Sequence, residues 1–66
     1  MTNEEVKELF FKREPVVFNG CIYQRITAII YRIDSYNNLI VSAELLDRNG
    51  RSVVIARAKD ISEVNK

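Results

Sequence analysis

The residues best suited to binding chemistry in this chain are aromatic and cationic side chains that alternate along one segment and the loop after it. They are Tyr23, Arg25, Tyr31, Arg32 and Tyr36. Aromatic and guanidinium groups carry much of the binding energy at protein interfaces. They also stack on nucleic-acid bases and contact phosphates. These five residues are therefore the candidate binding residues.

Catalytic chemistry is poorly represented in the sequence. The chain has no His, and no Ser, Thr, Tyr or Asp stands in the spacing of a nucleophile elbow, a phosphate loop or a carboxylate pair. The two glycines both follow asparagine, at Asn19-Gly20 and Asn49-Gly50, and turn geometry explains that dipeptide better than phosphate binding does. We therefore predict no catalytic residue and no enzyme activity.

The chain has a single cysteine, Cys21. It begins a predicted strand, and we expect it to be a buried, inert thiol. Without a second Cys or any His, the sequence offers neither an internal disulfide nor a metal-ligand cluster, so no metal and no cofactor are predicted. A lone Cys fits a reducing compartment, and no apolar run of about 20 residues predicts a membrane span. The expected location is cytoplasmic.

Length and charge limit the choice of partners. The 66 residues allow one domain, residues 1–66, with a formal net charge of +1. Residues 15–57 carry five Arg against three acids, a weak excess of +2. Nucleic acid is therefore kept as an alternative, against the simpler interpretation that Arg25 and Arg32 are solvated or paired with those acids. Because so small a domain buries only about 60% of its unfolded surface, self-association is also expected.

The start of the chain predicts a helix over about residues 3–13. Thr2 and Glu5 have the spacing of a capping box, and Pro15 ends the helical pattern. The apolar stripe of this helix is Val6, Leu9 and Phe10. An isolated helix of this length is unstable in water, so the stripe must pack on the rest of the chain.

The remainder, about residues 16–64, predicts strands separated by turns. The expected strands are 16–18, 21–34, 39–47 and 51–57, with a short strand or 3₁₀ turn around 61–64. The long second strand should bend near Thr27 or Ala28, as strands do when a sheet curls. Asn19-Gly20 is expected to form a two-residue hairpin turn, and Arg48-Asn49-Gly50 a second hairpin turn with the same Asn-Gly chemistry. The predicted fold class is mainly β, a small five-stranded barrel with one N-terminal helix.

Alternation along the predicted strand 39–47 identifies its faces. Leu39, Val41, Ala43 and Leu45 share one side, which predicts a continuous core face. The opposite side is only half apolar. A sheet with apolar residues on both sides needs more cover than one short helix supplies, which predicts a surface for a protein partner or a second copy.

The layout of a short helix, a proline and five strands resembles the SH3-like small barrels and, less closely, the Sm-like RNA chaperones of the Hfq family. REPVVFNG at 13–20 is similar to the entry into the first Sm-like strands, and VVIARAKDISEV at 53–64 to the closing strand, which joins subunits into a ring in that family. The resemblance implies an SH3-like barrel. The Tyr-Lys-His signature of the family's RNA pore is replaced here by residues 55–59, so no RNA-binding residue is carried over.

A second resemblance concerns NGCIYQRITAIIYR at 19–32 and SAELLDRNGRSVVIARAKDI at 42–61. These phrases are similar to small uncharacterised proteins of Gram-positive bacteria and their phages or mobile elements, a group that brings no established activity. The expected function is a non-catalytic interaction module that binds a protein partner or itself through an edge strand and the half-apolar face. The alternative is an Sm-like RNA- or DNA-binding protein that uses the same five residues.

Overall fold

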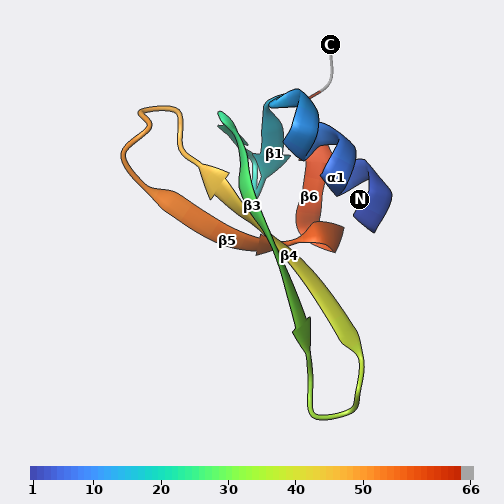
Figure 1. Ribbon diagram of the computed structural model, residues 1–66. Helices are drawn as coiled ribbons and strands as arrows, with labels where there is room; N and C mark the ends of the chain where they lie inside the picture. Colours follow the sequence, from blue (N-terminus) through green and yellow to red (C-terminus); the bar gives the residue numbers. More distant parts are fainter. Residues whose placement is uncertain (65–66) are drawn as a thin grey trace.

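The computed structural model describes residues 1–64 and shows one helix followed by short strands (Figure 1). The helix is α1 (Asn3–Lys12). The strands are β1 (Val16–Phe18), β2 (Cys21–Tyr23), β3 (Arg25–Ile33), β4 (Leu39–Leu46), β5 (Val53–Arg57) and β6 (Ile61–Glu63), with a 3₁₀ turn, η1 (Ala58–Asp60), before β6. The predicted helix, strand 16–18 and closing strand are confirmed to within a few residues.

Local side-chain chemistry sets both ends of α1. The predicted capping box is present: the Glu5 N–H donates to Thr2 Oγ1 at 3.2 Å, and the Thr2 N–H donates to Glu5 Oε1 at 2.9 Å. At the other end Arg13 takes a left-handed conformation with φ of 57°, and its N–H donates to the carbonyls of Leu9 and Phe10. The chain therefore turns away from the helix before it reaches Pro15.

The strands form two three-stranded antiparallel sheets, ordered β2-β1-β6 and β3-β4-β5. Asn19 and Gly20 have φ of 53° and 77°, which confirms the predicted two-residue turn between β1 and β2. The long predicted strand 21–34 is divided at Gln24, and its register with β4 shifts between Ile26 and Ala28. The bend predicted near Thr27 is therefore present as a bulge in β3.

The connection from β4 to β5 differs in part from the prediction. The predicted hairpin turn at Arg48-Asn49-Gly50 is present between β4 and β5, but Gly50 has a positive φ of 68° and Asn49 does not, so it lacks the paired positive φ values of Asn19-Gly20. The loop is longer and is organised by Asp47, whose carboxylate accepts from the Arg51 N–H at 3.1 Å and from Ser52 Oγ at 2.6 Å. Because Asp47 supplies these acceptors, β5 begins at Val53 rather than Arg51.

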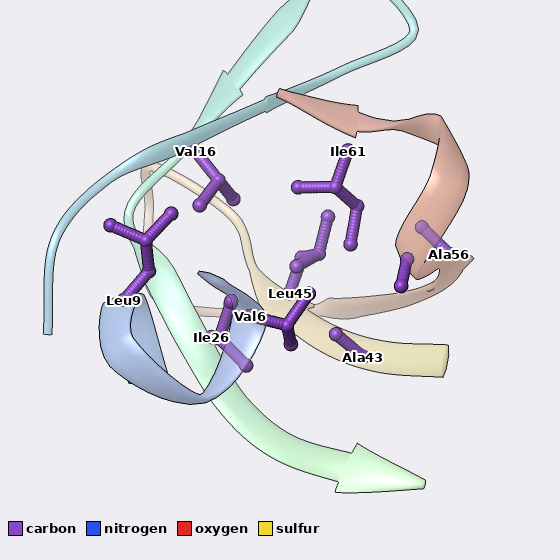
Figure 2. Close-up of a cluster of buried hydrophobic side chains, with 9 residues drawn as sticks. Val6, Leu9, Val16, Ile26, Ala43, Leu45, Ala56 and Ile61 are labelled. Atoms are coloured by element: carbon purple, nitrogen blue, oxygen red, sulfur yellow. The ribbon is translucent and has the colours of Figure 1, made fainter. Parts of the chain in front are cut away.

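One buried cluster is shared by the helix and both sheets (Figure 2). Its members are Val6, Leu9, Val16, Ile26, Ala43, Leu45, Ala56, Ala58 and Ile61. Val6 and Leu9 of α1 both belong to this cluster, and in Figure 2 Val6 lies beside Ile26 and Leu45 while Leu9 lies on the side of Val16. The predicted packing of the helix stripe is confirmed, with Phe10 partly buried at its margin.

The fold is mainly β, as the sequence predicts. The described residues form six strands rather than five, because the bent second strand is divided, and no strand pair joins the two sheets into one closed barrel. Within residues 1–64 no helix is long and apolar enough to cross a bilayer.

Candidate binding surfaces

The five candidate residues fall into two groups at different places. Tyr23 and Arg25 flank Gln24, where β2 gives way to β3, and Tyr23 is half-buried against Phe18 with ring centroids 6.2 Å apart. Tyr31, Arg32 and Tyr36 lie at the other end of β3 and in the loop after it, and all three are exposed. The structure therefore does not assemble the five residues into one site.

The second group belongs to a projecting two-stranded ribbon made of the far ends of β3 and β4 (Figure 1). β5 pairs with β4 only from Ser42 onward, so residues 39–41 have no third strand beside them. Tyr31 lies opposite Val41, and Ile33 lies opposite Leu39. By strand alternation these four side chains share one side, which we call the apolar ribbon face.

The apolar ribbon face is the outward continuation of the core. Ile29 and Ala43 precede it on the same side of the ribbon, and Ala43 is fully buried. Farther out the exposed fraction rises to 48% for Tyr31, 57% for Leu39 and 69% for Ile33. The prediction of a continuous core face in β4 is confirmed for Ala43 and Leu45 and wrong for Leu39, because the ribbon extends past the elements that would cover it.

The tip of the ribbon is held in a defined shape by Asp34. Its Oδ1 accepts from the Tyr36 N–H at 2.8 Å and from the Asn38 N–H at 2.9 Å. These hydrogen bonds hold the pKa of the Asp34 carboxyl below its usual value, and the bond from the Asn38 N–H has the largest effect. Tyr36 is 83% exposed on this loop, so its ring is presented to solvent by an ordered turn.

A small groove of about 250 Å³ lies at the base of the ribbon. Its walls include Leu39 and Val41 of the apolar ribbon face, and Arg57 and Lys59 near η1. None of the residues of 1–64 that line it is acidic. The groove therefore combines apolar and cationic lining residues.

A larger open groove of about 490 Å³ lies between the end of α1 and the start of β3. We call it the arginine groove, and it is lined by Phe10, Phe11, Arg13, Arg25, Ile26 and Thr27. Thr27 Oγ1 is already engaged, because it donates to Glu44 Oε1 at 2.7 Å. The guanidinium groups of Arg13 and Arg25, by contrast, make no side-chain hydrogen bond to another residue in 1–64.

The arginines are not paired with the acids of the sheets. Among residues 1–64 the ion pair within 4.0 Å is Lys12 with Glu8, at 2.7 Å on the surface of α1. The simpler interpretation was that Arg25 and Arg32 are solvated or paired with those acids; within residues 1–64 neither is paired, and Arg32 is solvated. Arg32 is exposed, whereas Arg25 is half-buried and its Nε is enclosed without a hydrogen-bond partner.

Cys21 is exposed, so the prediction of a buried thiol is wrong. It begins β2, a strand at the edge of its sheet whose first two residues are both exposed. A short edge strand with little packed over it leaves its outward side chains in solvent. Residues 1–64 contain no group of three or more His, Cys, Asp or Glu that could hold a metal ion.

Sequence reasoning missed four residues that help to form these surfaces, namely Phe11, Arg13, Ile33 and Leu39. Phe11 lies outside the apolar stripe of the helix. An aromatic residue outside the stripe is expected to be exposed, and that position could have identified Phe11 as a surface residue. Ile33 and Leu39 have the pattern of core residues, and only the length of the ribbon exposes them. Comparisons with protein-family models, curated proteins and solved structures found no match to this chain.

Proposed function

We propose that this chain is a non-catalytic interaction module that binds a protein partner, or a second copy of itself, through the apolar ribbon face. The observation that carries the proposal is the exposure of Tyr31, Ile33 and Leu39, at 48%, 69% and 57%, on a projecting ribbon. A contiguous apolar surface on a small domain is typical of an interaction site. The ordered Tyr36 beside it adds an aromatic side chain of the kind that anchors interfaces.

The proposed scaffold is an SH3-like small barrel. Two features support it. β1 pairs with both β2 and β6, which brings the first and last strands together. The Gln24 N–H donates to the Leu46 carbonyl at 2.8 Å, which carries the β3–β4 pairing back toward β2 across the division in the long strand. With β2 and β3 counted as one bent strand, the chain has the five strands of that layout.

The groove at the base of the ribbon indicates the chemistry of the partner. Arg57 and Lys59 line the same groove as Leu39 and Val41, and none of its lining residues within 1–64 is acidic. A segment that carries apolar side chains followed by an acidic one would match both kinds of lining residue. The partner surface is therefore expected to be apolar and mildly acidic.

The test of self-association is the mass of the protein in solution. Light scattering at micromolar concentration should give a multiple of 7.7 kDa, and Ile33→Ser should return the protein to the monomer. Val53→Ser is the matched control, because Val53 is 47% exposed but lies outside the ribbon. A monomer at every concentration, or equal effects of the two variants, would exclude self-association through this face.

A different protein as partner is tested by site-specific photo-crosslinking. A crosslinking residue at position 36, beside the apolar ribbon face, should capture a discrete protein from an extract of the native host. The same residue at position 51, in the loop before β5, is the control. Capture that Ile33→Ser abolishes supports the ribbon as the site, and equal capture at the two positions contradicts it.

RNA or DNA binding is the second candidate function. The observation that favours it is that none of the arginines among residues 1–64 is in an ion pair. Binding of this kind should weaken steeply between low and moderate salt, because released counterions drive it. Arg32→Ala should weaken it further, and labelled RNA and DNA that stay unbound at low salt would exclude this candidate.

A further inference from the structure

The arginine groove holds a cationic group whose hydrogen-bonding capacity is not used by the described residues. Arg25 lies at the first position of β3, and its Nε is shielded from solvent with no acceptor nearby. An N–H donor that has lost water without gaining an acceptor is unfavourable. No described residue accepts a hydrogen bond from the rest of this guanidinium either, so its acceptor has to come from solvent or from a ligand in the groove.

A second guanidinium reaches the same groove from a strained position. Arg13 caps α1 with φ of 57°, a conformation that glycine adopts at lower energy than any residue with a Cβ. Arg13 lines the groove together with Arg25, and no acidic residue among 1–64 lines it, the nearby Glu44 carboxylate being held by Thr27. An observed backbone outlier at a cleft supports a functional role for the side chain placed there.

Aromatic rings supply the apolar wall of the groove. Phe10 and Phe11 lie with ring centroids 5.2 Å apart and a tilt of 60°. Phe10 is partly buried against the core, whereas Phe11 is 78% exposed, so one ring anchors the wall and the other is available for contact. The volume of about 490 Å³ lies within the usual range of ligand pockets.

The combination fits one compact anion better than a polyanion. A nucleic acid binds mainly by placing many phosphates against many cations, but the groove offers two arginines on a chain of net charge +1. Glu14 directly follows Arg13 and opposes a longer run of negative charge. A guanidinium matches the two oxygens of a carboxylate in a planar, bidentate arrangement.

We propose that the arginine groove binds the carboxylate of an acidic peptide segment whose neighbouring side chains are aromatic or apolar. Arg13 and Arg25 hold the carboxylate, and the ring of Phe11 contacts the side chain beside it. This site shares no residue with the apolar ribbon face, so it goes beyond the proposed function, and either proposal can fail alone.

The experiment follows the Arg Nε–H signals in proton–nitrogen correlation spectra during titration with small probes. The peptide acetyl-Phe-Asp-Phe-amide should shift the Arg25 and Arg13 signals at millimolar concentration. The matched peptide acetyl-Phe-Asn-Phe-amide, which lacks the charge, should leave them in place at the same concentration. Inorganic phosphate and a short oligothymidylate are titrated in parallel.

Variants connect the shifts to the groove. Arg25→Gln and Arg13→Gly should each weaken peptide binding by roughly tenfold or more, the usual loss for a hydrogen bond to a charged group. Because φ at position 13 suits glycine, Arg13→Gly should keep or raise the melting temperature, so lost binding cannot be attributed to unfolding. Arg51→Gln, in the loop before β5, is the control and should bind as the parent protein does.

Several results would overturn the proposal. They are the absence of shifts with acetyl-Phe-Asp-Phe-amide, equal shifts with the asparagine peptide, equal shifts with phosphate alone, and unchanged affinity in both groove variants. Stronger shifts of the same signals with oligothymidylate would assign the groove to nucleic acid instead. None of these results depends on the apolar ribbon face.

Discussion

At the scale of single residues, two aspartates fix the conformation of the two loops that connect β3, β4 and β5. Asp34 accepts two backbone N–H groups in the ribbon tip, and Asp47 accepts one backbone N–H and the Ser52 hydroxyl in the loop before β5. Each carboxylate replaces the backbone partner that a tight hairpin would have supplied. These loops are therefore stabilised by ionised side chains, and their stability depends on pH.

The acid dependence follows from the direction of the pKa shifts. The hydrogen bond from Ser52, and then the Arg51 N–H, hold the pKa of Asp47 below its ordinary value. A group whose pKa is lower in the folded state contributes its full stabilisation above the unfolded pKa and loses it as pH falls through the folded pKa. The protein should therefore become less stable below about pH 4.

The variant Asp47→Asn tests this assignment. Urea unfolding at a series of pH values should show a smaller acid-dependent loss of unfolding free energy in Asp47→Asn than in the parent, because one titrating group is gone. Asp60→Asn is the control, since Asp60 makes no side-chain hydrogen bond to the residues described. Parallel pH profiles for the parent and Asp47→Asn would show that Asp47 is not linked to folding.

At the scale of elements, α1 is determined locally at its ends and by tertiary packing along its side. The capping box and the surface pair of Glu8 and Lys12 are properties of the helix itself. They contribute little next to packing, because a helix of 10 residues is marginal alone. Val6 and Leu9, 0% and 5% exposed, join the helix to the shared core.

Truncation of the helix stripe should therefore destabilise the whole fold. Leu9→Ala should cost about 2 to 5 kcal/mol, the usual range for removal of a buried leucine side chain. Lys7→Ala, on the exposed side of α1, should change stability by less than about 0.5 kcal/mol. Thermal unfolding followed by circular dichroism measures both, and equal melting temperatures for the two variants would exclude docking through Leu9.

At the scale of the whole molecule, one cluster connects the helix and both sheets. It includes residues from every described element except β2, namely α1, β1, β3, β4, β5, η1 and β6. Such a shared core couples the elements, and small domains of this kind usually unfold in one transition. The ribbon extends away from this core, and the molecule is elongated accordingly, with extents of 36 × 24 × 21 Å.

The exposure of two leucines on the same side of β4 shows where the core ends. Leu45 is 0% exposed and Leu39 is 57% exposed. Leu45→Ala should cost about 2 to 5 kcal/mol, while Leu39→Ala should cost well under half as much, because little apolar surface is lost from a buried site. Urea unfolding should show a single transition in the parent, and similar losses in the two variants would contradict the boundary of the core.

Local signals in the sequence predicted the elements well. The capping box, Pro15 and the Asn19-Gly20 turn depend on the conformations of a few neighbouring residues, so their outcome did not require the rest of the fold. The bulge near Thr27 was predicted from strand length alone. The second hairpin turn was predicted at the right place but with the wrong conformation at Asn49, because the Asp47 carboxylate accepts from the Arg51 N–H in that loop.

The exposure of side chains and their proximity in space were predicted less well than the elements. Alternation correctly placed Leu39 on the core side of β4, but it carries no information on how far the covering elements extend. The same limit applies to Cys21, which lies on an edge strand, and to Arg13 and Arg25, which are 12 positions apart in the chain and line one groove.

The sequence by itself determined a mainly β chain with one capped helix, one tight hairpin turn and a bent long strand, because these depend on local conformational preference. Only the tertiary structure decided which apolar side chains are exposed and which arginines line the same groove. It also placed Tyr23 and Arg25 apart from Tyr31, Arg32 and Tyr36. The physical reason is that exposure and proximity depend on where β5 and α1 end relative to β3 and β4, and that relation is set by packing between distant segments.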